Sequence, residues 1–286
     1  MVWGKKMKIR LLAFDLDGTT LYNHGELSEA NRAALEAAAE KGVLLVPATG
    51  RLYSFIPSSV LSLPARYVLF SNGAVVCDRK TNQTLVSNLI PVEQAAALME
   101  LCDRFGLFYE FYTDGGAVTL TDHEHYAMDV LHFPEEKRRF LRKHYIDETD
   151  HPAQYIRQRK ICPEKLNLPY VPDEVREPFL QAAEELGTFE ISYSLRDNLE
   201  FNAPGVHKGK GLAELCRVLG IDRSEVMAMG DSENDRGMLE FAGVSVAMGN
   251  ANEAIRSIAR FTTDRCEDDG AAHAVKRFIL SSEAVE

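Results

Sequence analysis

The stretch "LLAFDLDGTTL", residues 11–21, joins a short apolar run to two carboxylates. Residues 11–14 are apolar, Asp15 ends the run, and Asp17 follows it by two positions, ahead of a glycine and two threonines. A run of about four apolar residues that stops at a polar residue is typical of a strand buried on both faces of a parallel sheet. The stretch therefore predicts a strand with two acids at its carboxyl end, where parallel sheets bind ligands.

Four more apolar runs end in the same way, at residues 42–48, 67–70, 225–229 and 244–248. Helical patterns lie between the runs, at residues 28–42, 209–220 and 233–243, and each ends in glycine. In the first of these, Ser28 is the predicted N-cap and Gly42 the predicted stop. Alternating strands and helices predict an α/β fold, a Rossmann-like parallel sheet with right-handed crossovers.

The carboxyl ends of parallel strands lie at one edge of a sheet. The residues that follow four of the predicted strands are polar, and we expect them to meet there: Asp15, Thr49, Asn72 and Asp231.

Residues 85–197 have a different, irregular pattern that is richer in aromatic residues. The segment 105–120 alternates around Asp-Gly-Gly, which predicts a β-hairpin. We therefore predict an inserted α+β domain at 85–197, within an α/β core made of residues 1–84 and 198–286. The aromatic residues at 105, 108, 109, 111 and 112 are expected to form most of the inserted domain's core.

The chain has 286 residues and a net charge of -11, from 32 basic and 43 acidic residues. This balance argues against a nucleic-acid binder or a protein that binds an anionic membrane surface, because both need a basic face. No apolar run approaches the ~18 residues of a membrane span. The five cysteines are scattered, so we expect no disulfide framework and a reducing, cytoplasmic location. The sequence makes no prediction of oligomeric state.

The two acids after the first strand can have distinct roles. Asp15, at the rigid strand end, is the candidate nucleophile, since a carboxylate can attack phosphorus and form an aspartyl-phosphate. Asp17, in the turn, is the candidate acid that protonates the leaving oxygen and then activates water. Thr19 is a candidate hydrogen-bond donor to the transferred phosphoryl group.

A second acidic stretch, "GDSENDRGML" at 230–239, points to a metal site. Asp15, Asp17 and Asp231 together resemble a Mg²⁺ site, because Mg²⁺ binds one or two carboxylates together with waters and phosphate oxygens. Asn234 and Asp235 are candidates to orient water or phosphate, or to hold Lys208.

Donor groups for a phosphate complete the pattern. Thr49 and Gly50 offer a hydroxyl and a backbone N–H. Lys208 begins a predicted helix, whose N-terminus favours anions, and it suits the stabilisation of transition-state charge. Arg51 is interpreted equally well as a structural anchor or as a substrate contact.

Three other features favour ordinary structural roles. Residues 205–211, "GVHKGKG", lack the spacing of a P-loop. His123 and His125, at alternate positions, have no third ligand in view and are expected in an exposed loop. The charged run 135–143 is expected to be a solvated helix face.

Seven motifs together carry a family resemblance. The chain resembles the haloacid dehalogenase superfamily, and most closely its Cof-like (type IIB) branch of capped sugar-phosphate phosphatases. The motifs are "DLDGTTL" (15–21), "ATGR" (48–51), "SNGA" (71–74), "GVHKGKGL" (205–212), "GDSENDRGML" (230–239), "VAMGNA" (246–251) and "EDDGAA" (267–272).

The resemblance implies a Mg²⁺-dependent enzyme with an aspartyl-phosphate intermediate, and it implies that 85–197 is the cap that determines substrate specificity. Asp15 would be the nucleophile and Asp17 the acid/base. The implied metal ligands are Asp15, the backbone carbonyl of Asp17, and Asp231, and the implied phosphate contacts are Thr49, Gly50, Lys208 and Asn234.

The expected function is therefore hydrolysis of a small phosphomonoester, such as a sugar phosphate or another phosphorylated metabolite. A phosphotransferase or phosphomutase would use the same intermediate and differ only in the acceptor. A dehalogenase has no use for an acid at position 17 or for the metal cluster. A non-catalytic phosphometabolite sensor would not need Asp17.

Overall fold

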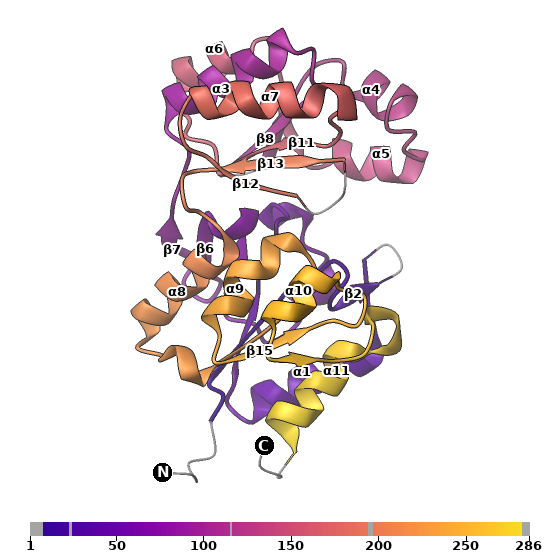
Figure 1. Cartoon of the computed structure of the whole chain (residues 1–286), viewed down its shortest axis with the longest axis vertical. Helices are drawn as coiled ribbons and strands as arrows, with labels where there is room; N and C mark the ends of the chain where they lie inside the picture. Colours follow the sequence, from indigo (N-terminus) through magenta and orange to yellow (C-terminus); the bar gives the residue numbers. More distant parts are fainter. Residues whose placement is uncertain (1–7, 23–24, 115, 194–196, 282–286) are drawn as a thin grey trace. The chain divides into compact units, whose positions relative to one another are not determined.

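The computed structural model describes residues 8–22, 25–114, 116–193 and 197–281, and these divide into two units (Figure 1). The core unit takes its described residues from Met1–Gly50, Ile56–Ser87 and His207–Glu286. The inserted unit consists of Arg51–Phe55 and Asn88–Val206. The predicted boundaries at 85 and 197 therefore differ from the observed ones by a few residues, and the short segment 51–55 was not anticipated.

The main sheet of the core unit is parallel, with the strand order β16-β15-β14-β1-β4. The opening stretch supplies β1, the neighbour of both β14 and β4, so Asp15 lies at the end of an interior strand. The strands span Leu11–Phe14 (β1), Leu44–Pro47 (β4), Val226–Gly230 (β14), Val244–Ala247 (β15) and Phe261–Thr262 (β16).

The predicted strand at 67–70 belongs to a second sheet. It forms β5 (Tyr67–Phe70), which pairs antiparallel with β6 (Val75–Asp78), and β6 pairs with β7 (Gln83–Ser87). The expectation that one sheet holds all four strand ends is wrong in this respect. A single parallel bridge between Ala48 and Leu69 nevertheless sets β5 beside β4.

The helices of the core unit follow the predicted patterns closely. Ser28 is confirmed as the N-cap of α1, where its hydroxyl accepts the Asn31 N–H at 3.0 Å. Residues 233–235 form a 3₁₀ turn, so the predicted helix at 233–243 is shorter than expected. The helices are α1 (Glu29–Glu40), α2 (Ser58–Leu61), α8 (Lys208–Leu219), α9 (Arg236–Phe241), α10 (Glu253–Ile258) and α11 (Gly270–Val275), and a small hairpin pairs β2 (Leu21–Tyr22) with β3 (Glu26–Leu27).

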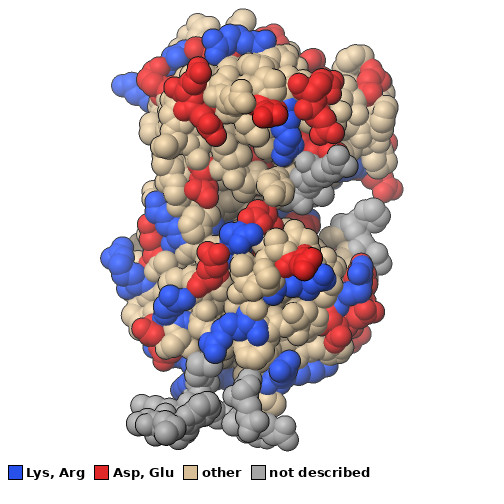
Figure 2. Space-filling view, in the orientation of Figure 1, with Lys and Arg blue, Asp and Glu red and all other residues tan. Residues whose placement is uncertain are grey.

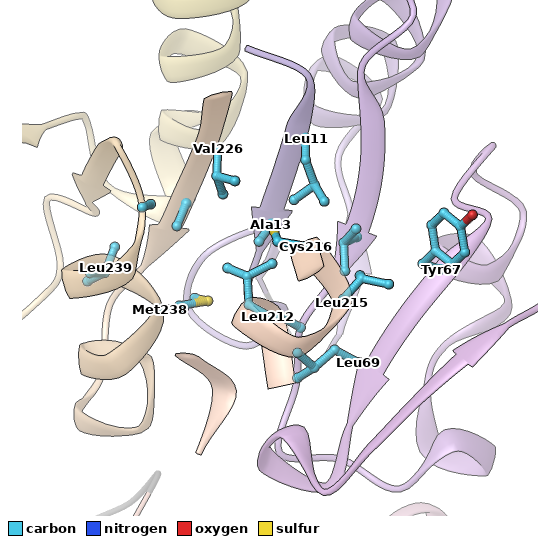
Figure 3. Packing of buried hydrophobic residues seen from close by; sticks show 14 of the residues in the cluster. Leu11, Ala13, Tyr67, Leu69, Leu212, Leu215, Cys216, Val226, Met238 and Leu239 are labelled. Atoms are coloured by element: carbon cyan, nitrogen blue, oxygen red, sulfur yellow. The ribbon is translucent and has the colours of Figure 1, made fainter. Parts of the chain in front are cut away.

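One face of the main sheet packs against α8 and α9 (Figure 3). Leu11 and Ala13 of β1, two positions apart and hence on one face, contribute to a buried cluster with Leu212 and Leu215 of α8. Each fully buried leucine of this kind stabilises the fold by about 1.5–3 kcal/mol. This packing fixes the start of α8 relative to β1.

The inserted unit is an α+β unit with a six-stranded sheet in the order β10-β9-β8-β11-β13-β12. The predicted hairpin is confirmed as the antiparallel pair of β8 (Glu110–Thr113) and β9 (Gly116–Thr119). The other strands are β10 (Tyr145–Glu148), β11 (Lys165–Leu168), β12 (Glu190–Ser192) and β13 (Leu199–Asn202). Because β13 pairs with β11 and β12, the inserted sheet extends past the predicted limit at 197.

Helices α3, α6 and α7 lie on one side of this sheet (Figure 1). Phe179 of α7 makes an edge contact with Phe201 of β13, at 5.9 Å between ring centroids. The helices of the unit are α3 (Val92–Arg104), α4 (His123–Asp129), α5 (Glu135–Arg142), α6 (Pro152–Arg159) and α7 (Asp173–Glu185).

The expectation of an exposed loop at 122–125 is wrong. Both histidines lie in α4, and the His123 side chain is buried, with its ring 5.0 Å from that of Tyr145. The charged run at 135–143 is confirmed as a solvated helix, α5, with no buried residue. The five cysteines are free thiols. Within the described residues, no helix is long and apolar enough to cross a membrane.

Candidate active site

Two carboxylates are brought together by the pairing of β1 with β14. Asp15 follows β1 and Asp231 follows β14, and the Asp15 N–H donates to the Met229 carbonyl at 3.0 Å, continuing the ladder. Asp235 lies one 3₁₀ turn beyond Asp231. Oxygens of Asp15, Asp231 and Asp235 lie within 4.8 Å of one another, as expected for the carboxyl edge of the sheet.

Lys208, which is the first residue of α8, also contacts this cluster. Its side chain is fully buried, and its Nζ lies 2.6 Å from Asp15 Oδ1, 2.6 Å from Asp235 Oδ1 and 3.4 Å from Asn234 Oδ1. An ammonium group has three N–H donors, so these contacts can use them all. Lys208 thus holds the two carboxylates in fixed positions.

The cluster contains more negative than positive charge. Burial, followed by repulsion from Asp235, raises the pKa of Asp15 well above its usual range despite Lys208. The same two causes raise the pKa of Asp231 to about 7. Burial lowers the pKa of Lys208, but attraction from Asp15 and Asp235 outweighs it and raises that pKa above its ordinary value. Three carboxylates around one ammonium favour a further cation.

A divalent cation fits the donor set at Asp15 and Asp231 better than at Asp235. Both oxygens of Asp235 accept short hydrogen bonds, Oδ1 from Lys208 at 2.6 Å and Oδ2 from the N–H groups of Asp231 and Ser232 at 2.9 and 3.0 Å. At Asp231, the contact of Asn250 Nδ2 with Oδ2 is longer, at 3.4 Å. The exposed Asp17 side chain is not among the three clustered carboxylates. Two carboxylates completed by waters and phosphate oxygens suit Mg²⁺.

The turn after β1 is fixed by the residues around it. Thr19 Oγ1 donates to Asp231 Oδ1 at 2.9 Å, which orients that carboxylate. The contact of Thr19 with a phosphoryl group stays a prediction. Gly18 has φ +77°, and a Cβ there would lie 2.5 Å from Asp231 Oδ2, so only glycine fits. Asn250 Nδ2 donates to the Gly18 carbonyl at 2.8 Å.

The predicted phosphate-binding residues lie at neighbouring strand ends. The Thr49 N–H donates to the Leu69 carbonyl at 2.9 Å, and the Asn72 N–H donates to the Thr49 carbonyl at 3.1 Å. Asn234 Nδ2 lies 3.4 Å from Asn72 Oδ1, which connects this side to the Lys208 cluster. Gly50, next to Thr49, is half-buried.

Arg51 belongs to the inserted unit, where its guanidinium donates to the Phe55 carbonyl at 2.9 Å. The Phe55 ring in turn meets those of Tyr112 and His144, with centroids at 5.8 and 4.8 Å. These contacts favour the interpretation of Arg51 as an anchor.

Two residues of the site were missed in the sequence. Ser232 donates to Asn234 Oδ1 at 2.7 Å and forms a capping box with Asp235. Asn250 follows β15 and so lies at the same sheet edge. The signals that could have found them are the Ser-x-x-Asp spacing and the strand end in "VAMGNA".

Charged side chains elsewhere are intermixed. On the visible face of the described residues, basic and acidic groups alternate over both units without a large area of one sign (Figure 2).

Comparison with known proteins agrees with this site. The profile of the haloacid dehalogenase-like hydrolases matches residues 12–275. The chain is 29% identical over 280 residues to the 5-amino-6-(5-phospho-D-ribitylamino)uracil phosphatase YcsE of Bacillus subtilis, covering 98% of this chain and 99% of that protein. It is 28% identical over 287 residues to the pyridoxal phosphate phosphatase YbhA of Escherichia coli, with coverage of 96% and 99%.

Solved structures give the same result. A subclass IIB sugar phosphatase of the superfamily superposes with a TM-score of 0.78 at 26% identity, covering 94% of this chain and 98% of its own. The matches span both units and every residue of the cluster described above. The chain therefore belongs to the haloacid dehalogenase-like hydrolases, among the capped phosphatases of this superfamily.

Proposed function

We propose that this phosphatase hydrolyses a small phosphomonoester with the help of Mg²⁺, through a phosphoryl group carried on Asp15. The observation that carries the proposal is Lys208, whose Nζ lies 2.6 Å from both Asp15 and Asp235 within a buried excess of carboxylates. This arrangement holds an anionic nucleophile beside a fixed cation at a sheet edge suited to ligand binding.

In the first step, an oxygen of the Asp15 carboxylate attacks phosphorus, and the bond between phosphorus and the leaving oxygen breaks. Asp17, as a carboxylic acid, gives its proton to that oxygen, so the alcohol leaves neutral. In the second step, the Asp17 carboxylate takes a proton from a water that attacks phosphorus. Inorganic phosphate leaves, and Asp15 is regenerated. The exposed position of Asp17 supports this exchange of protons with substrate and water.

The other residues position these groups. We assign Thr49, Gly50, Lys208 and Asn234 to the phosphate oxygens, with Asn72 holding Asn234. Asp235 orients Lys208, and Thr19 orients Asp231. Asp15, Asp231 and the Asp17 carbonyl would hold Mg²⁺, which neutralises charge between the nucleophile and the phosphate when bound.

The inserted unit, in this proposal, selects the leaving group among small phosphorylated metabolites. The relatives named as phosphatases of phosphoribitylaminouracil and of pyridoxal phosphate support this substrate class. The five free cysteines support a reducing cytoplasm.

Phosphate release from a panel of phosphorylated metabolites, with Mg²⁺ or with a chelator, tests the proposal. We expect Mg²⁺-dependent release, a loss of at least about 10⁴-fold in Asp15→Asn, and trapped phosphoenzyme in Asp17→Asn. Full activity of Asp15→Asn would overturn the nucleophile assignment. Transfer of phosphate to an added alcohol without release into water would replace hydrolysis with the phosphotransferase alternative.

A further inference from the structure

The first turn of α8 lies unusually close to α9. A Cβ on Gly209 of α8 would lie 2.2 Å from the Gly237 carbonyl oxygen of α9, where ordinary contacts begin at about 3.4 Å. A Cβ on Gly211 would lie 2.9 Å from the Gly73 carbonyl oxygen, in the turn after β5. The start of α8 therefore touches backbone on two sides.

His207, immediately before Lys208, fills the space over Gly237. The three atoms nearest to a Cβ on Gly237 would all belong to the His207 ring, with Nδ1 at 2.2 Å and Cε1 at 2.6 Å. That Nδ1 is buried and has no hydrogen-bond partner among the described residues. An imidazole nitrogen buried without a partner is unfavourable, so packing against Gly237, not hydrogen bonding of this atom, accounts for the ring's position.

Neither Gly209 nor Gly237 is required by the backbone. Neither has a positive φ, and both lie within helices, where glycine is less favourable than alanine. Glycine therefore makes both helices, α8 and α9, less stable than alanine would at these positions. What glycine provides here is space for a close approach of the two helices.

We propose that Gly209 and Gly237 are positioning residues that set Lys208 between Asp15 and Asp235, and that the His207 ring only fills the space that Gly237 leaves open. His207 and Gly209 flank Lys208 directly in the chain, and Gly237 lies two residues after Asp235. Relief of a 2.2 Å contact needs a shift of about 1 Å, which would stretch a 2.6 Å hydrogen bond beyond useful length. These residues act through Lys208 and Asp235 and touch no substrate.

This inference rests on the proposed function only where activity is measured. Gly209→Ala and Gly237→Ala are compared with Gly243→Ala, a matched control in the same unit. A Cβ on Gly243 would also clash with backbone, at 2.6 Å from Ser224 Cα, and its three nearest atoms all belong to Arg223 and Ser224. We expect kcat to fall at least about 30-fold in the first two variants, as for a displaced catalytic group, and to stay within about 3-fold in folded Gly243→Ala.

A suppressor separates positioning from loss of stability. The three atoms nearest to the new methyl group in Gly237→Ala all belong to the His207 ring, so adding His207→Ala should restore kcat about tenfold or more relative to Gly237→Ala. The same addition should not restore Gly209→Ala, whose clash is with backbone. Equal kcat in Gly209→Ala, Gly237→Ala and Gly243→Ala would overturn the inference, as would failure of the suppressor.

Crystal structures of the wild type and of Gly209→Ala provide a readout independent of activity. A Lys208 Nζ to Asp15 Oδ1 distance that lengthens in the variant supports the positioning role even if the wild type releases no phosphate, a result that would contradict the proposed function alone. An unchanged distance overturns the positioning role even if phosphate is released.

Discussion

Lys208 in the core unit and Lys165 in the inserted unit are both buried, 0% and 2% exposed, but their surroundings differ. Lys208 contacts two carboxylates, each at 2.6 Å, in a cluster with an excess of negative charge. Lys165 pairs with Glu200 at 3.2 Å and lies over the Tyr112 ring, 4.8 Å from its centroid. Lys208 lies in the candidate active site, whereas Lys165 lies in the β-sheet of the inserted unit.

The carboxylates near Lys165 accept hydrogen bonds from neutral side chains, which stabilise their charge without cancelling it. Glu200 accepts from Asn198 at 3.2 Å, and Glu110 accepts from Tyr145 at 2.9 Å and from Asn167 at 2.9 Å. A buried ion pair is therefore weak evidence for a site. What distinguishes the core cluster is that three carboxylates lie within 4.8 Å of one another around the ammonium group of Lys208, which leaves a net negative charge.

Of the two lysine replacements, that of Lys208 should have the larger effect on turnover. In Lys208→Met, kcat should fall by about 10²–10³-fold because a fixed cation is lost from the transition state. The measurement is phosphate release per folded molecule, with folding checked by circular dichroism. A kcat within threefold of the wild-type value would show that the two buried lysines do not differ in the way proposed.

Replacement of Lys165 should instead act on stability. Lys165→Met leaves Glu200 buried without its cation, which should lower the free energy of unfolding by about 3 kcal/mol. Urea unfolding measures this loss. Adding Glu200→Gln removes the unpaired charge and should restore part of the stability, so a double variant less stable than Lys165→Met would contradict the ion-pair explanation.

The difference between the two lysines also shows what a sequence can predict. Lys208 was predicted because it begins a predicted helix and lies in the motif at 205–212, and the alternation of strands and helices predicted the core fold. Lys165 gives no such signal, because its partner Glu200 is 35 positions away and reaches it only through the pairing of β11 with β13.

The errors have similar physical causes. The assignment of β5 to the main sheet failed because an apolar run does not encode whether its partner strand is parallel or antiparallel. Asp235 was correctly predicted as a candidate to hold Lys208, but no spacing rule shows that its other oxygen accepts hydrogen bonds from two backbone N–H groups. The segment 51–55 joins the inserted unit through side-chain packing of Phe55 with residues distant in sequence.

The smallest expected effect concerns Asp231 and is read in thermal stability. Its folded-state pKa of about 7 exceeds its ordinary value, so its contribution to stability is present at low pH and is lost as pH rises through about 7. With a chelator at pH 8, Asp231→Asn should therefore raise Tm by about 2–4 °C, and at pH 5, where only part of this stability is lost, the rise should be smaller. With Mg²⁺ at pH 8 the order should reverse, because the cation stabilises only the protein that keeps its carboxylate ligand. The asparagine still accepts from Thr19, so the turn is preserved. An equal rise in Tm on adding Mg²⁺ to both proteins would remove Asp231 from the proposed metal ligands, and the charge imbalance around Lys208 would then need another cation.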